Sequence, residues 1–189
     1  RIYILLLSAV LIIGGSGCSV KNESSETKRP EPTLNEWQKD FLSEQKLPTE
    51  YEELNLTQRL SVAAIYEMIM YLEDKYGVTF EYTGYVRPQI LENEYMTAIP
   101  KGGNELTDTV TVTRQDDGTL KDDYPNIVVR PYFEQMITDY VEDYFGSDDI
   151  RVFSTVTKTS VNDLTIITEE TISGNISGRS TVFLSLIHI

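Results

Sequence analysis

Four aspartates around one predicted hairpin form the densest group of side chains that could bind a metal ion. They lie in the stretch DDGTLKDD, as Asp116, Asp117, Asp122 and Asp123. Carboxylate oxygens of this kind hold Ca²⁺ in extracellular proteins, but their spacing here differs from that of a calcium-binding loop. Asp-Gly is also a residue pair that favours a tight hairpin turn. We therefore interpret the group as a solvated turn and predict no metal site.

The tyrosines could line a groove for a peptide or a sugar. Of the 12 tyrosines in the chain, the candidates are Tyr82, Tyr85, Tyr95, Tyr124 and Tyr132. Tyrosine rings in strands and helices more often pack half-buried, with an apolar body and a hydrated tip. Trp37, the only tryptophan, is expected to dock a short helix on the domain rather than to stack on a ligand.

The chain has one cysteine, Cys18, and one histidine, His188. His188 lies in the final segment LSLIHI, residues 184–189, which resembles the translation of a transposase adapter used in sequencing libraries. We therefore expect this segment to be foreign and the coding sequence to stop near Phe183. The alternative is a native apolar strand over residues 181–189.

Without His188, the sequence lacks Ser-His-Asp and Cys-His nucleophile systems and histidine zinc sites. Gly102-Gly103 has neither the Lys-Ser/Thr of a P-loop nor the spacing of a dinucleotide-binding motif. We predict no catalytic residue, no cofactor and no enzyme activity. The alternative is a cell-envelope hydrolase with two Asp or Glu side chains across a cleft, which the 30 acidic residues permit without indicating it.

The beginning of the chain indicates its location. Residues 2–13 carry no charge; Arg1 precedes them, and Gly14-Gly15-Ser16-Gly17 and Cys18 follow. This is the pattern of a secretory signal peptide. Residues 15–18 resemble the lipobox of bacterial lipoproteins, although Gly15 departs from its preferred aliphatic residue. The resemblance implies a signal peptide over residues 1–17 and a diacylglyceryl group on Cys18 at the outer face of the cytoplasmic membrane.

Two other interpretations of this stretch are open. Cys18 is an inert buried thiol in one, and residues 2–20 are an uncleaved membrane anchor in the other. Residues 18–33 read as a flexible, solvated tether, because Ser19–Thr33 contains one apolar residue among Ser, Glu, Lys and Pro. The net charge of −14 excludes a nucleic-acid partner and repels anionic headgroups.

Hydrophobic periodicity predicts a single α+β domain over residues 34–183. Two main helices are expected on one face of a mostly antiparallel sheet, in the order α-α-β-β-β-β-α-β. Helices are predicted at 34–45, 56–76 and 131–145, and strands at 78–83, 95–99, 107–114, 119–122 and 150–156. Residues 164–172 are compatible with strand or helix, and a further strand is predicted to begin at 180–183.

Both long helices end in an aromatic residue and glycine and lead into a strand, at Tyr76-Gly77 and Phe145-Gly146. We interpret them as pseudo-repeated helix–strand units. The order of features over about residues 56–157 is similar to that of small lipoproteins of gut Firmicutes. These features are the segment YLEDKYGVTF, a strand, an acidic turn with Tyr-Pro, a helix and the pair Phe-Gly. The resemblance implies a location and a shape, without an activity.

We therefore expect a lipid-anchored surface lipoprotein with a non-enzymatic binding domain. Its expected partners are the membrane, through Cys18, and an envelope or extracellular component of unknown identity. A transport-associated binding lipoprotein is the second alternative, although such proteins have two lobes and this chain is short for that.

Overall fold

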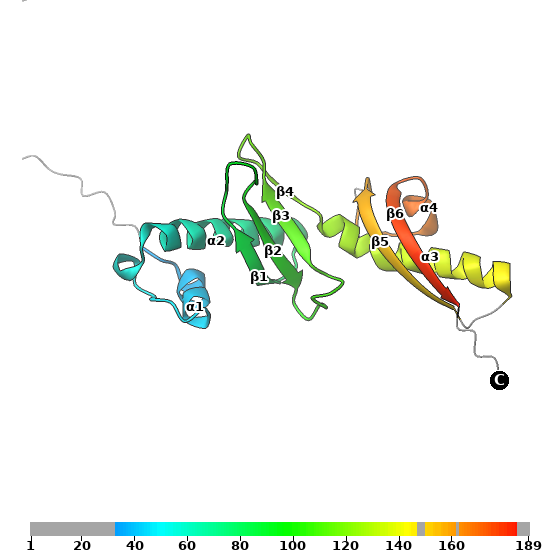
Figure 1. The fold of residues 1–189 in the computed structure, drawn as a ribbon, viewed down its shortest axis with the longest axis horizontal. Helices are drawn as coiled ribbons and strands as arrows, with labels where there is room; N and C mark the ends of the chain where they lie inside the picture. Colours follow the sequence, from blue (N-terminus) through cyan, green and yellow to red (C-terminus); the bar gives the residue numbers. More distant parts are fainter. Residues whose placement is uncertain (1–32, 147–149, 162, 185–189) are drawn as a thin grey trace, which may run out of the picture. The chain divides into compact units, whose positions relative to one another are not determined.

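A computed structural model describes residues 33–146, 150–161 and 163–184. Cys18, the predicted signal peptide and nearly all of the tether lie outside the described residues, as do residues 185–189 of the predicted foreign tail. The elements, drawn in Figure 1, are α1 (Glu36–Glu44), η1 (Tyr51–Glu53), α2 (Leu56–Tyr76), β1 (Phe80–Val86), β2 (Tyr95–Pro100), β3 (Val110–Arg114), β4 (Leu120–Asp122), α3 (Tyr124–Phe145), β5 (Ile150–Thr159), α4 (Glu169–Ile172) and β6 (Ile176–Leu184). Among these described helices, none has the length and hydropathy of a bilayer-crossing segment.

Local sequence signals set the ends of the first two helices. Asn35 and Asn55 each accept a hydrogen bond from the backbone N–H of a glutamine three residues on, and that glutamine side chain accepts one in return. This reciprocal pairing satisfies N–H groups that have no partner inside the helix. Gly77 ends α2 in the left-handed conformation, with φ 65°, and its N–H donates to the Glu73 carbonyl at 2.8 Å. The predicted bounds of α2 are therefore confirmed.

Strands β1 to β4 form an antiparallel sheet in sequence order. The predicted turn between β3 and β4 is present at Asp117-Gly118, where Gly118 has φ 84° and the Thr119 N–H donates to Asp117 Oδ1 at 2.9 Å. The inward side chains of this sheet meet α1 and α2 in the larger hydrophobic core. Its most deeply buried members are Leu42, Met68, Ile69, Leu72, Met96, Ala98, Val110 and Val112.

Helix α3 begins earlier than predicted. We expected Pro131 at its first position, but the helix starts at Tyr124 and Pro131 lies in its interior. Pro125 lies in the first turn of the helix instead. A proline costs little there, because a backbone N–H at that position would have no partner inside the helix. A proline inside a helix loses one backbone hydrogen bond. The extra turns nevertheless bury Val129 fully and pack Tyr124 and Ile127 on the larger core, so tertiary packing outweighs that loss.

The remaining strands form a second sheet. β5 and β6 pair antiparallel with each other alone among the described strands. The inward side of β5 packs on α3, where Ile150 and Val152 meet Val141 and Ile137 in a separate small core. Residues 164–172 end in the short helix α4.

The predicted α+β class and the approximate order of elements are confirmed. The arrangement differs from expectation in one respect: the strands divide between two sheets, with α2 on the first and α3 against the second. β4 has only three residues, and only Asp123 separates it from α3. The chain therefore leaves the first sheet at this point, and β5 does not extend that sheet but pairs with β6.

Candidate binding groove

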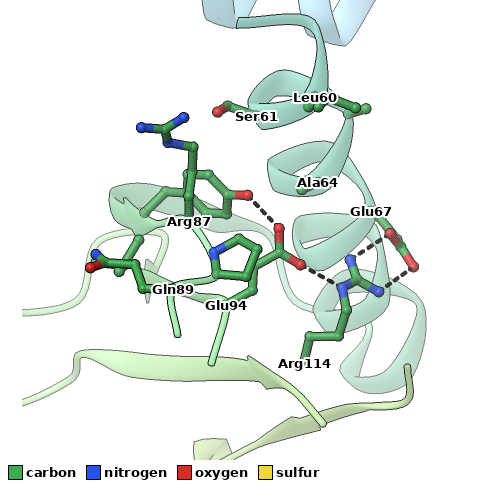
Figure 2. Close-up of a pocket in the computed structure, with 12 residues that line it drawn as sticks. Leu60, Ser61, Ala64, Glu67, Arg87, Gln89, Glu94 and Arg114 are labelled. Carbon is green, nitrogen blue, oxygen red and sulfur yellow. Dashed lines mark hydrogen bonds and ion pairs between the residues drawn. The ribbon is translucent and has the colours of Figure 1, made fainter. Parts of the chain in front are cut away.

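A groove of about 980 Å³ lies between α2 and the end of β1. Figure 2 shows Ser61 and Ala64 on the helix, with Arg87 and Gln89 opposite. The lining residues are Leu60, Ser61, Ala63, Ala64, Glu67, Tyr85, Val86, Arg87, Pro88, Gln89, Glu94 and Arg114.

The helical wall of the groove arises from the sequence of α2. Residues 60, 64 and 67 are spaced i, i+4 and i+7, so they lie on one side of the helix. The core-facing side carries Val62, Ile65, Met68, Ile69 and Leu72. Small side chains at Ser61 and Ala64 let a ligand approach the helix backbone closely. In the structure, the core lies on one side of this helix and the groove on the other.

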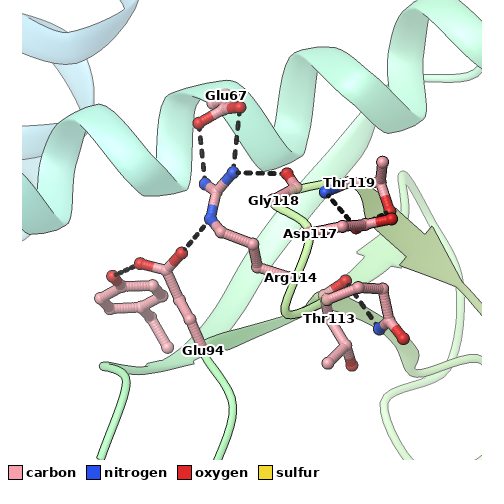
Figure 3. Close-up of polar contacts among 9 residues, drawn as sticks. Glu67, Glu94, Thr113, Arg114, Asp117, Gly118 and Thr119 are labelled. Atoms are coloured by element: carbon pink, nitrogen blue, oxygen red, sulfur yellow. Dashed lines mark hydrogen bonds and ion pairs between the residues drawn. The ribbon is translucent and has the colours of Figure 1, made fainter.

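Arg114 on β3 links the two walls (Figure 3). Its guanidinium forms a two-pronged ion pair with Glu67 of α2, at 2.8 and 3.2 Å, and its Nε donates to Glu94 at 2.5 Å. It also donates to the Gly118 carbonyl at 3.4 Å. The Tyr85 hydroxyl donates to the other oxygen of Glu94. The planar guanidinium suits this arrangement because it donates in several fixed directions at once.

These contacts shift the pKa values of Glu67, Arg114 and Tyr85. The hydrogen bond from Arg114 holds the pKa of Glu67 below its ordinary value, and the two carboxylates raise the pKa of Arg114. Burial and the bond to Glu94 raise the pKa of the Tyr85 hydroxyl. Arg114 thus contacts both Glu67 and Glu94, so each of these three side chains already has a partner within the protein.

Unlike Arg114, Arg87 forms no ion pair with any residue that the structure describes. Its guanidinium lies 3.5 Å from the Thr57 hydroxyl at the start of α2. Apolar side chains are exposed nearby: Leu60 on the helical wall is 62% exposed, and Ile90 and Leu91, which lie outside the groove lining on the following turn, are almost fully exposed. A backbone hydrogen bond from the Gln89 N–H to the Glu92 carbonyl, at 2.9 Å, closes that turn.

The four aspartates of the predicted hairpin do not converge. Asp116 and Asp117 are exposed at the turn, and Asp123 accepts a hydrogen bond from the Thr111 N–H at 2.6 Å. Asp122 is directed to α2 and has a fully buried side chain. Among the residues that the structure describes, no three His, Cys, Asp or Glu side chains gather as metal ligands would.

Asp122 instead joins β4 to α2. It accepts hydrogen bonds from the hydroxyls of Tyr71 and Tyr76, at 2.8 and 2.7 Å, and from the Lys75 ammonium at 2.6 Å. The Tyr124 N–H donates to it at 3.1 Å. The carboxylate is thus satisfied on all sides by the protein itself. We assign it a structural role.

The candidate tyrosines are divided among several places. Tyr85 lines the groove, Tyr82 meets Phe41 edge to face, and Tyr124 packs on Tyr76 and Phe80. Tyr95 is half-buried on β2, and Tyr132 is exposed on α3. Only one of the five therefore belongs to the groove.

Trp37 docks α1, as predicted. Its ring stacks on Phe41, with centroids 5.3 Å apart, and also meets Tyr66 of α2. Sequence reasoning did not single out the groove residues Leu60, Arg87 and Arg114. Their only sequence signal was the pair Ala63-Ala64, which widens the apolar surface of α2.

Comparisons with protein-family models, with curated proteins and with solved structures found no match.

Proposed function

We propose that this chain is a lipid-anchored surface lipoprotein whose domain binds an extended polypeptide segment in the groove between α2 and β1. The anchor part of the proposal rests on the uncharged stretch before Cys18 and its resemblance to a lipobox. The binding part rests on one observation: apolar Leu60, Ala63 and Ala64 line the helical wall of the groove, while its central charges are paired with one another.

Size and chemistry favour a peptide segment as the ligand. A volume of about 980 Å³ accommodates several side chains. Exposed Leu60 in the groove, and Ile90 and Leu91 on the adjoining turn, offer contacts to large apolar side chains, and Arg87 offers a charge-assisted hydrogen bond to a carboxylate. We therefore expect the ligand to carry bulky apolar residues next to an acidic residue or a C-terminal carboxylate.

The carboxylates in the groove also bear on the alternative of an Asp/Glu hydrolase. Such an enzyme needs one carboxyl group with a raised pKa to act as the general acid. Glu67 has the opposite shift, because Arg114 stabilises its ionised form. Glu94 is bound by the same guanidinium and by Tyr85. This arrangement favours binding over acid catalysis.

A displayed random peptide library, selected on the full chain, tests the binding proposal. The selected peptides should share bulky apolar residues beside a carboxylate. Leu60→Asp should weaken their binding at least tenfold, because the charge opposes an apolar contact. Leu106→Asp is the matched control: Leu106 is also exposed, at 92%, but does not line the groove, so affinity should not change. Equal loss in both variants, or no enrichment at all, would overturn the proposal.

A further inference from the structure

The two carboxylates that pair with Arg114 in the groove differ in their exposure to water. The Glu67 side chain, on α2, is 55% exposed, whereas the Glu94 side chain, before β2, is 11% exposed. The Arg114 side chain is 25% exposed and lines the groove, so a molecule in the groove can reach its guanidinium. The two partners of this arginine are therefore not equivalent.

Glu94 is the more firmly held partner. Its carboxylate accepts one hydrogen bond from Arg114 Nε and, through its other oxygen, one from the Tyr85 hydroxyl. The backbone joins the same residues, because the Arg114 N–H donates to the Glu94 carbonyl at 2.8 Å. An enclosed carboxylate that left these donors would gain little water in return, so release of Glu94 is costly.

Glu67, by contrast, is held by Arg114 alone among the described residues. Arg114 Nη2 and Nη1 donate to its two oxygens at 2.8 and 3.2 Å, as Figure 3 shows. Because the Glu67 side chain is more than half exposed, water can replace the guanidinium as its partner. An ion pair of this exposure contributes little to stability. Glu67 can therefore turn into solvent at a small cost.

The Nη1 and Nη2 groups of Arg114 are oriented for a carboxylate by contacts other than Glu67. The Nε bond to Glu94 and the bond from Nη1 to the Gly118 carbonyl, at 3.4 Å, fix the plane of the guanidinium. A carboxylate binds such a pair of donors through two parallel hydrogen bonds. Donors that are already oriented lose little freedom when a ligand binds, which favours affinity.

Arg87, the other arginine in the groove lining, lacks this orientation. Its side chain is exposed, and its one hydrogen bond within the described residues is the 3.5 Å contact with the Thr57 hydroxyl. An exposed guanidinium gains little from one ion pair, because water screens the charge and holding the side chain in place costs entropy. Arg87 can attract a carboxylate to the groove, whereas Arg114 is better placed to hold it.

We infer that Glu67 occupies the carboxylate-binding position of the groove in the free protein, and that a carboxylate of the bound peptide replaces it on Nη1 and Nη2 of Arg114. This inference rests on the proposed function of the groove. Glu67 then acts as an internal competitor, because a peptide without a carboxylate cannot take its place, and so it makes the groove selective for acidic peptides. Ala64, one turn before Glu67 on α2, is small enough to let the peptide reach Arg114.

Peptides selected from the displayed library test this inference on the full chain. Each is synthesised with its carboxylates intact, with its acidic side chains replaced by amides, and with an amidated C-terminus, so that the two sources of a carboxylate are compared. The measured quantity is the dissociation constant of the amide form divided by that of the acid form. Glu67→Gln should raise this ratio at least tenfold, because Arg114 then has no competing carboxylate at Nη1 and Nη2.

Four further variants separate replacement of Glu67 from an effect of charge alone. Glu67→Asp keeps the charge but shortens the side chain, so it should also raise the ratio, whereas repulsion alone would leave the ratio unchanged. Asp74→Asn removes a charge from an exposed position of α2 outside the groove lining and should have no effect. Arg114→Gln should bring the ratio close to one, while Arg87→Gln should preserve most of it.

Urea unfolding curves of Glu67→Gln and Glu67→Asp should match the parent, since Glu67 is exposed. These two variants therefore decide the result even if Arg114→Gln does not fold. The inference is wrong if both leave the ratio unchanged, or if Arg87→Gln rather than Arg114→Gln abolishes the preference for the acid form; the proposed function would then still stand. Failure to enrich any peptide, on the parent and on Glu67→Gln alike, would refute the proposed function and this inference together.

Discussion

Replacing Asp122 by asparagine should destabilise the larger core, although the two side chains have nearly the same shape. The carboxylate is fully buried and accepts hydrogen bonds from Lys75, Tyr71, Tyr76 and the Tyr124 N–H. An asparagine keeps one acceptor oxygen but presents an N–H₂ group to donors. At least one of the four hydrogen bonds must therefore be lost, together with the ion pair to Lys75.

The expected cost is about 2–4 kcal/mol. A hydrogen bond to a charged group contributes about 1.5–3 kcal/mol, and breaking a buried ion pair costs about 3–5 kcal/mol. The Lys75 side chain is 44% exposed, so water recovers part of the lost attraction and the lower end of this range applies. For a domain of this size the melting temperature should fall by roughly 5–15 °C.

The pH dependence of the difference in unfolding free energy between the parent and Asp122→Asn should identify the carboxylate as the cause of the destabilisation. Burial opposes ionisation, but the hydrogen bonds from Lys75, Tyr76 and Tyr71 outweigh it and hold the pKa of Asp122 below its ordinary value in the folded chain. In the unfolded chain the group titrates near its ordinary pKa of about 3.9. Its stabilisation is therefore complete above that value and is lost as the pH falls through the lower, folded pKa.

Urea unfolding of the full chain measures this difference. The gap between the parent and Asp122→Asn should be largest near neutral pH and should close in strong acid. Asp116→Asn is the matched control, because it removes the same charge from an exposed position of the same hairpin. It should change the free energy of unfolding by less than about 0.5 kcal/mol. Equal stability of Asp122→Asn and the parent at neutral pH would refute the structural role of Asp122.

Three further changes have definite expected results. Gly178→Ala should cost about 1–3 kcal/mol of unfolding free energy, because its Cβ would lie 2.6 Å from the Thr155 carbonyl oxygen; an unchanged urea midpoint would contradict this packing. Arg114→Lys should lower the free energy of unfolding by about 1 kcal/mol and weaken binding of the peptides selected from the library. The reason is that an ammonium cannot form the two-pronged pair with Glu67 and also reach Glu94. Urea unfolding would show the first effect and peptide titration the second. Cys18→Ala should abolish incorporation of a labelled fatty acid in cells, whereas equal labelling of parent and variant would rule out lipid attachment at this residue.

Elements with strong local signals could be predicted from the sequence. Asn55 and Gln58 mark the start of α2, Gly77 marks its end, and Asp117-Gly118 marks the turn between β3 and β4. Each signal depends on residues a few positions apart. The start of α3 was mispredicted because Pro131 is a local signal against a helix interior, while burial of Val129 depends on contacts that the sequence alone does not display.

The candidate site was harder to predict for the same reason. Arg114, Glu67 and Glu94 lie on β3, on α2 and before β2, and only the folded chain brings them together. The four aspartates of the hairpin look equivalent in sequence. Burial separates them, since Asp122 is enclosed by α2 while Asp116 stays in water.

Chemical-shift mapping by NMR tests the proposed binding function most directly. The full chain, labelled with ¹⁵N, would be titrated with a peptide from the library selection. Binding in the groove predicts that the largest shifts occur at Ser61, Ala64, residues 85–87 and Gln89, and that Leu60→Asp removes them while Leu106→Asp does not. Shifts that gather on another surface, or that persist unchanged in Leu60→Asp, would contradict the assignment of the groove as the binding site.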